Sequence, residues 1–297
     1  MIFDIRIYVI VAMFMIACIS LMFFNFVIIR YSKSKYILST NKINKWKHIL
    51  HEQMTRTSNK GIYALKHEKL LLKKLSKPEN LITYSHALQY LKNQLPQAYN
   101  IYTSMNYSAF KKLADIYSRK PSIERACYAD FICNFPQVAG KIYTPLLDTL
   151  VSHIDNSHIH CRTNILRALC SIGNVQGISN ALQLINDKIL FMHSEILTNE
   201  LSNFKGNKQA LANCLWNESR SWNNNTMIAV IQFITEFSEH YREAFLPILY
   251  NPSVDLEVRI AAARYFEKHI YEPAYPILIE LITNPADINL SAVAASA

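Results

Sequence analysis

The sequence predicts an all-α protein, an α-solenoid of helix pairs preceded by one transmembrane helix. Three observations support this fold class. The 297 residues include only five glycines, which is few for a fold that needs many tight turns. Past residue 78, apolar stretches of about 12 to 16 residues alternate with short breaks that carry Pro, Asn, Gly or Ser. A run of 23 uncharged residues lies near the N-terminus.

This run, residues 7–29, predicts the transmembrane helix. Its sequence is IYVIVAMFMIACISLMFFNFVII. As a helix it would extend about 35 Å, enough to cross a hydrocarbon core of about 30 Å. One alternative is a cleaved signal peptide, whose apolar region is usually shorter. A second is a bacterial lipoprotein signal ending at Cys18, but the chain stays apolar after Cys18. Both comparisons favour a retained anchor.

Basic residues follow the predicted span directly. Those before the first acid, Glu52, are Arg30, Lys33, Lys35, Lys42, Lys45 and Lys47. Because short loops rich in Lys and Arg stay cytoplasmic, they predict a single-pass protein of the cell (inner) membrane. The N-terminus would lie outside and the C-terminal domain in the cytoplasm.

The charge of the chain is concentrated in one segment. Residues 30–77 contain 13 Lys and Arg against two acids, whereas residues 78–297 contain 17 against 19. The basic segment indicates either contact with anionic lipid headgroups or plain positive-inside bias. The near-neutral remainder disfavours nucleic acid as a partner.

Landmarks recur in the C-terminal part at the spacing of a helical repeat. Pro145, Pro247 and Pro276 each lie near the start of a predicted second helix, and the first two are 102 residues apart, or three steps of 34. Residues 161–167 align with 258–264, which sets Arg162 against Arg259. A period of about 30 to 37 residues is typical of solenoids. The expected helix pairs are 122–153, 158–187, 190–218, 224–250 and 254–284, and Asn223 to Asn225 predict a loop and N-cap before the fourth.

Residues 251–262, NPSVDLEVRIAA, resemble the first helix of a HEAT repeat, in which an Asp precedes Val-Arg and a small residue. Pro276-Ile277-Leu278 resembles the Pro-Leu-Leu of the second helix. The resemblance covers 251–284 best, then 121–174, and is weakest over 190–250. It implies that Asp255 and Arg259 link neighbouring repeats, and that Arg162 has the same role as Arg259. A ligand-binding role for these arginines is the alternative.

Three regions are expected along the chain. Residues 1–30 would form the anchor, 31–77 a basic juxtamembrane helical segment, and 78–297 the repeat domain. Within the last, 78–120 would form an atypical capping pair. Residues 286–297 match only the first helix of a further unit, so the C-terminal repeat is expected to be incomplete. Either a partner covers this end, or the sequence is a fragment of a longer protein.

Signals for chemistry are weak. His153, His158, His160 and Cys161 form the densest cluster of metal-ligand types, but adjacent helical residues diverge by about 100° and no distant Cys or His pair completes a site. No P-loop, GxGxxG or GxSxG motif occurs. The six cysteines lack CxxC spacing and are typical of reduced thiols in a cytosolic domain. We therefore expect no catalytic residue, no metal and no cofactor.

The expected function is that of a scaffold or adaptor that binds a protein partner, of a kind the sequence does not identify, at the cytoplasmic face of the membrane. The resemblance implies one more specific option, because membrane-tethered bacterial HEAT proteins accompany membrane glycosyltransferases in polysaccharide export. One alternative is a HEAT-like enzyme of the bilin lyase or DNA base glycosylase type. Another is a membrane-bound sensor, with Ser20 and Asn25 at a helix–helix contact.

Overall fold

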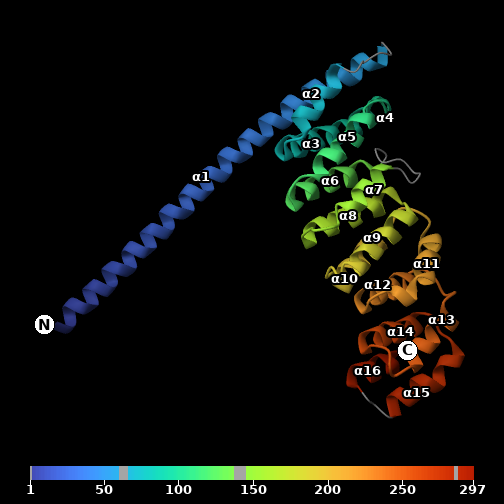
Figure 1. Cartoon of the computed structure of the whole chain (residues 1–297). Coiled ribbons are helices and arrows are strands. Elements are labelled where there is room, and N and C mark those ends of the chain that lie inside the picture. The colour runs from blue at the N-terminus through green and yellow to red at the C-terminus, as the bar shows by residue number, and fades with distance from the viewer. Residues whose placement is uncertain (1, 60–65, 137–144, 284–286) are drawn as a thin grey trace. The chain divides into compact units, whose positions relative to one another are not determined.

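The fold is all-α, as the sequence predicts (Figure 1). A computed structural model describes residues 2–59, 66–136, 145–283 and 287–297. Within these ranges the regular secondary structure consists of α-helices and short 3-10 helices, and no strand occurs. Some side chains of the first two helices lie outside the description, and these are the side chains of residues 2–12, 25–29, 31–36, 56–59 and 66–67. The chain divides into two units, residues 1–63 with 82–99 and residues 64–81 with 100–297.

The first helix, α1, runs without a break over Ile2–Asn59. The sequence predicted an anchor over residues 1–30 and a basic helical segment over 31–77. The helix continues through the change from apolar to basic composition at residue 30. The reason is local, because no glycine or proline occurs before Gly61 to end it.

The structure contradicts the predicted single-pass membrane localisation. Within the described part of the chain, no helix combines the length and apolarity needed to cross a bilayer. The predicted orientation, with the N-terminus outside and the rest in the cytoplasm, depended on this span and is withdrawn with it.

The unit of residues 1–63 and 82–99 contains all of α1 and most of α3 (Pro78–Gln94). Leu50 and Met54 of α1 are fully buried. The Trp46 ring meets the Tyr84 ring edge-on, with centroids 5.2 Å apart. This aromatic contact and the buried aliphatic side chains fix α1 against α3.

The unit of residues 64–81 and 100–297 contains most of the helices. It begins with α2 (Lys66–Leu75), the end of α4 (Pro96–Met105) and α5 (Tyr107–Ser118). Residues 78–118 therefore carry three helices, α3, α4 and α5, where a capping pair was expected. The tyrosine Tyr117 of α5 is buried, and its hydroxyl donates to the Leu75 carbonyl at 2.9 Å.

Alternate helices of this unit then form two rows (Figure 1). The first-helix row consists of α6 (Ser122–Asn134), α8 (Ile159–Ile172), α10 (Ser194–Ser202), α12 (Asn224–Thr235), α14 (Leu256–Lys268) and α16 (Ile288–Ser296). Each helix of this row contacts the next. The second helices are α7 (Pro145–Ser152), α9 (Val175–Asp187), α11 (Lys208–Asn217), α13 (Arg242–Tyr250) and α15 (Tyr275–Thr283). Contacts run from α5 to α7, α9 and α11 in turn. Two rows of alternating helices are compatible with an α-solenoid.

Asparagine caps begin three helices of these rows, α9, α11 and α12. The side chains of Asn174, Asn207 and Asn223 accept hydrogen bonds from the amides three residues later, at 2.7, 3.0 and 3.0 Å. Such caps satisfy amides that the first turn of a helix leaves unpaired. The cap predicted at Asn223 to Asn225 is thus confirmed at Asn223, which begins α12.

Candidate functional site: a polar network on the first-helix row

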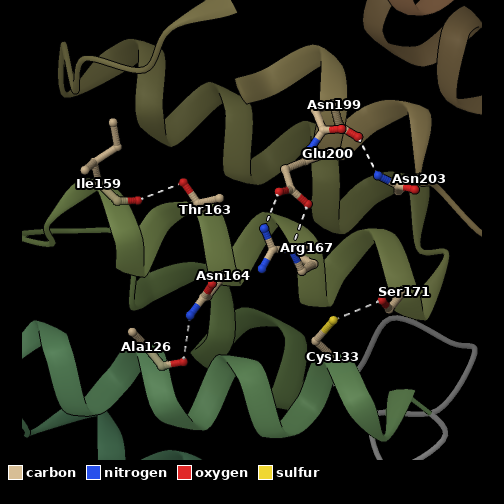
Figure 2. A network of polar contacts seen from close by, with 10 residues as sticks. All are labelled: Ala126, Cys133, Ile159, Thr163, Asn164, Arg167, Ser171, Asn199, Glu200 and Asn203. Carbon is tan, nitrogen blue, oxygen red and sulfur yellow. Dashed lines mark hydrogen bonds and ion pairs between the residues drawn. The ribbon is translucent and has the colours of Figure 1, made fainter. Parts of the chain in front are cut away.

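A network of polar side chains joins α6, α8 and α10 (Figure 2). Its centre is the ion pair between Arg167 of α8 and Glu200 of α10. The Arg167 Nη2 lies 2.8 Å from Glu200 Oε1, and Nε donates to Oε2 at 3.3 Å. The Glu200 residue is 2 % exposed, whereas the Arg167 side chain is 46 % exposed. The hydrogen bond to Glu200 raises the pKa of Arg167. A two-pronged bond to a buried carboxylate holds the two helices in one register.

Similar links occur at the neighbouring junctions of the row. On the α6 side, the Asn164 amide donates to the Ala126 carbonyl at 3.3 Å, 38 residues away. On the α12 side, the Thr198 hydroxyl donates to Gln232 Oε1 at 2.6 Å, across 34 residues. The Arg167–Glu200 link spans 33 residues. The separations of 33 and 34 residues fall within the predicted period of about 30 to 37, and that of 38 lies one residue above it.

The fourth junction, between α12 and α14, has an exposed ion pair. Lys268 Nζ lies 3.3 Å from Glu236 Oε2, 32 residues earlier in the chain. Nearby, His269 shares a 2.9 Å contact with the Thr235 carbonyl. Every junction from α6 to α14 is therefore bridged by at least one side chain.

The thiols of the network are not activated. Cys133 Sγ of α6 lies 3.3 Å from the Ser171 hydroxyl of α8. Burial raises the pKa of Cys133 and of Cys170. A raised pKa keeps the thiol protonated, and the thiolate is the reactive form. All six cysteines of the chain are free.

The predicted repeat residues Arg259, Asp255 and Arg162 make different contacts in the structure. Arg259 is 9 % exposed, and its Nε donates to the Leu249 carbonyl at the end of α13, at 3.2 Å. Asp255 acts within its own helix, where its carboxylate caps α14 by accepting from the Glu257 amide at 3.0 Å. Arg162 is also buried, but among the described residues its Nε has no hydrogen-bond partner.

Arg125 of α6 was not predicted, yet it makes the clearest contact of this kind. Its two terminal nitrogens donate to the carbonyls of Asp155 and Asn156, at 3.0 and 2.9 Å, in the turn after α7. Asn156 has a positive φ of 49°. The alignment of 161–167 with 258–264 did not reach Arg125, although Arg125 precedes Arg162 by 37 residues, close to the repeat period.

The predicted proline landmarks fall at three different helix positions. Pro145 is the first residue of α7 and Pro276 the second of α15, where a missing N–H costs nothing. Pro247 lies inside α13. The shared Pro-Leu-Leu pattern therefore marks second helices without fixing one structural position.

The predicted basic residues lie along α1, at positions 30–47. Arg30, Lys42 and Lys45 are exposed, while the side chains of Lys33 and Lys35 lie outside the description. Lys47 is half-buried, with its Nζ 3.8 Å from the centroid of the Tyr90 ring. Lys47 therefore takes part in the packing of α1 on α3 through a cation–π contact.

The histidine and cysteine cluster is dispersed. His153 and Cys161 are buried, whereas His160 is exposed at the start of α8. Among the residues that the structure describes, no group of three His, Cys, Asp or Glu could hold a metal ion. Comparison of the chain with family models, curated proteins and solved structures finds no match to any of them.

Proposed function

We propose that the chain is a HEAT-like α-solenoid scaffold that binds a protein partner along its first-helix row and does not catalyse a reaction. The HEAT-like assignment is supported by the contact between Arg259 and the end of α13, since the resemblance implies that this arginine links repeats. It is also supported by the alternation of the two helix rows.

The observation that carries the proposal is the set of side-chain links at successive junctions of this row. Their spacings of 38, 33, 34 and 32 residues place one link in each repeat. Links of this kind hold the helices in register before a partner arrives. A preformed surface loses less conformational entropy on binding than a flexible one.

The exposed side chains of the row favour a protein as the partner. Exposed polar residues of the first three helices of the row are Asp130, Arg167 and Asn199, and Glu236 is exposed directly after the fourth, α12. Acidic, basic and amide groups therefore alternate along the surface. A mixed polar surface suits the rim of a protein interface, whereas nucleic acid requires a surface dominated by Lys and Arg.

The test compares two variants of the full chain carrying an affinity tag. Asp130→Lys with Asn199→Lys alters the first-helix row and keeps both members of the Arg167–Glu200 pair. Asp187→Lys with Ala210→Lys makes the same charge change at exposed positions of α9 and α11. We expect a stoichiometric protein to co-purify with the wild type and the control, and to be lost from the first variant, while circular dichroism melts stay alike.

Two outcomes would count against the scaffold. Equal loss from both variants would remove the first-helix row as the binding surface. A purified chain that carries a bound small molecule in place of a stoichiometric protein would favour a HEAT-like enzyme.

A further inference from the structure

One face of α15 carries large apolar side chains that are exposed. Tyr275, Ile279 and Ile282 follow each other at helical spacings of four and three, and they are 42, 58 and 43 % exposed. We call these three residues the α15 stripe. Leu278 is the buried residue of this helix, which packs on α16. The stripe is therefore an apolar face that the described chain does not cover.

The surroundings of the α15 stripe are acidic. Glu272 precedes α15 and Glu280 lies on it, and both are exposed. Residues 272–297 contain three acids, with Asp287 as the third, and no Lys, Arg or His. A partner for this face therefore needs apolar groups flanked by cations.

The helix α2 has the opposite character. Exposed cations lie along its surface and just after its end, and these are Lys69, Lys73, Lys74 and Lys77. Leu70, among them, is 58 % exposed. An exposed leucine surrounded by lysines is the chemical complement of an apolar stripe flanked by glutamates.

The inner side of α2 is held parallel to α5. At the start of both helices, the Ser108 hydroxyl donates to Glu68 Oε1 at 3.3 Å. Lys112 Nζ, in the middle of α5, lies 2.9 Å from the same oxygen. At their ends, the Tyr117 hydroxyl donates to the Leu75 carbonyl and Lys120 donates to the Ser76 carbonyl. These contacts fix which side of α2 faces α5 and leave the lysines and Leu70 on the outer side.

We propose that the α15 stripe of one copy of this chain docks against α2 of a second copy, in a head-to-tail association. Within the unit, α2 packs on α5 at the beginning of the helix rows, and α15 belongs to the last helix pair. The two surfaces therefore lie at opposite ends of one unit and meet only between copies. Apolar contact supplies attraction, and the lysine–glutamate complementarity selects the pairing.

The expected association is weak and depends on salt. One helix against one helix buries less than the roughly 1,200 Å² at which stable interfaces begin. Exposed charge pairs of this kind are screened when the Debye length falls from about 10 Å to a few ångströms. A micromolar equilibrium that shifts with ionic strength follows from both features.

Sedimentation velocity of the full chain, at about 0.05 M and about 0.5 M salt, tests the proposal. Lys69→Glu with Lys73→Glu should weaken association by about tenfold or more at low salt, and so should Glu272→Lys with Glu280→Lys. An equimolar mixture of the two variants should associate again, because opposite charges then face each other at both kinds of contact. Lys188→Glu with Lys205→Glu, and Asp187→Lys with Glu267→Lys, make the same charge changes at exposed positions away from α2 and α15, and should sediment like the wild type.

The proposal is overturned if the wild type is monomeric at low salt across the micromolar range. It is equally overturned if both charge variants associate like the wild type, or if the mixture fails to recover. Association that is unaffected by salt would come from the exposed apolar residues of α1 between Met13 and Phe24, which no variant alters. The outcome of this experiment does not depend on whether a protein partner binds the first-helix row, because the two tests substitute different surfaces.

Discussion

Gly173 and Gly206 lie back to back in the structure. A Cβ added to Gly173 would lie 2.8 Å from the Gly206 nitrogen, and one added to Gly206 would lie 2.4 Å from the Gly173 oxygen. Gly173 ends α8 with a φ of 76°, and Gly206 lies in the turn between α10 and α11. Beside them the Lys205 amide donates to the Cys170 carbonyl at 2.9 Å. Two of the five glycines in the chain thus allow two neighbouring turns to touch through their backbones.

We expect both glycines to resist substitution. Gly173→Ala forces a side chain into the left-handed region, which costs about 1–2 kcal/mol, and adds a clash with the facing turn. Gly206→Ala overpacks the contact and should cost about 1–3 kcal/mol. Urea unfolding followed by circular dichroism measures both. Lys205→Ala keeps the backbone bond and should stay within about 0.5 kcal/mol of the wild type. Alanine variants as stable as this control would mean that the two turns do not touch.

Ile189 occupies a position where a glycine would be more stable. Its φ is 51°, and it follows α9 in a Schellman arrangement, with Leu190 N donating to the Ile185 carbonyl and Ile189 N to the Asn186 carbonyl. This position favours glycine or asparagine, and a β-branched residue there is strained. The Ile189 side chain is 89 % exposed, so burial does not compensate for the strain.

Ile189→Gly is therefore expected to stabilise the fold by about 1 kcal/mol, since the strain relieved exceeds the added freedom of the unfolded chain. Ile189→Asn should act in the same direction. Phe191→Ala is the control, because Phe191 is also exposed but has no positive φ. Thermal unfolding should show a higher Tm than the wild type for Ile189→Gly and Ile189→Asn, and no such rise for Phe191→Ala. A lower Tm for Ile189→Gly would contradict the strain.

Removing one member of the Arg167–Glu200 pair is expected to cost more stability than removing both. Arg167→Met leaves the buried Glu200 carboxylate without its cation and should cost about 2 kcal/mol. This is below the cost of breaking a fully buried pair because Arg167 is 46 % exposed. The double variant Arg167→Met/Glu200→Met should recover much of this loss, since well-packed apolar residues often replace a buried pair without cost. A double-mutant cycle in urea measures the coupling, and strictly additive single effects would exclude it.

The sequence predicted the helix pairs between 122 and 284 because Pro, Asn and Gly interrupt the apolar stretches there at near-regular intervals. The role expected of Arg259 came from the resemblance to HEAT repeats, and in the structure its Nε donates to the Leu249 carbonyl. The boundary expected at residue 30, between the anchor and the basic helical segment, is not a helix end, for a physical reason. A change of composition does not end a helix, and the residues that do, glycine and proline, are absent until Gly61.

The junction contacts could not be predicted because their partners come from different repeats. Glu200 lies between Leu197 and Leu201 on the buried side of α10, so a charge within an apolar stripe was the available signal. Arg167 precedes it by 33 residues, and Gly173 precedes Gly206 by the same interval. A search for complementary residues one period apart would have found both pairs. The outward direction of the α15 stripe has no such signal, since exposed and buried isoleucines look alike in a sequence.

His153 makes the stability of the fold depend on pH in the acid range. It is 1 % exposed, lies against the Tyr128 ring, and among the described residues neither ring nitrogen has a hydrogen-bond partner. Burial, and then the nearby Arg125 guanidinium, lowers the pKa of His153 to about 4. The Ala114 carbonyl opposes this shift without reaching hydrogen-bonding geometry. In the unfolded chain the pKa returns to about 6.5.

Because its folded pKa is depressed, the unfolded state binds more protons than the folded state between these two values. The stabilisation by neutral His153 is therefore present above about pH 6.5 and is lost as the pH falls towards 4, by up to about 3 kcal/mol. His153→Phe keeps an aromatic ring against Tyr128 and removes the titration. Urea midpoints of both proteins between pH 7 and 5 should show the wild type losing about 2 kcal/mol more than the variant over this range. Parallel pH profiles would mean that His153 is protonated in the folded protein, with its charge accommodated beside Arg125.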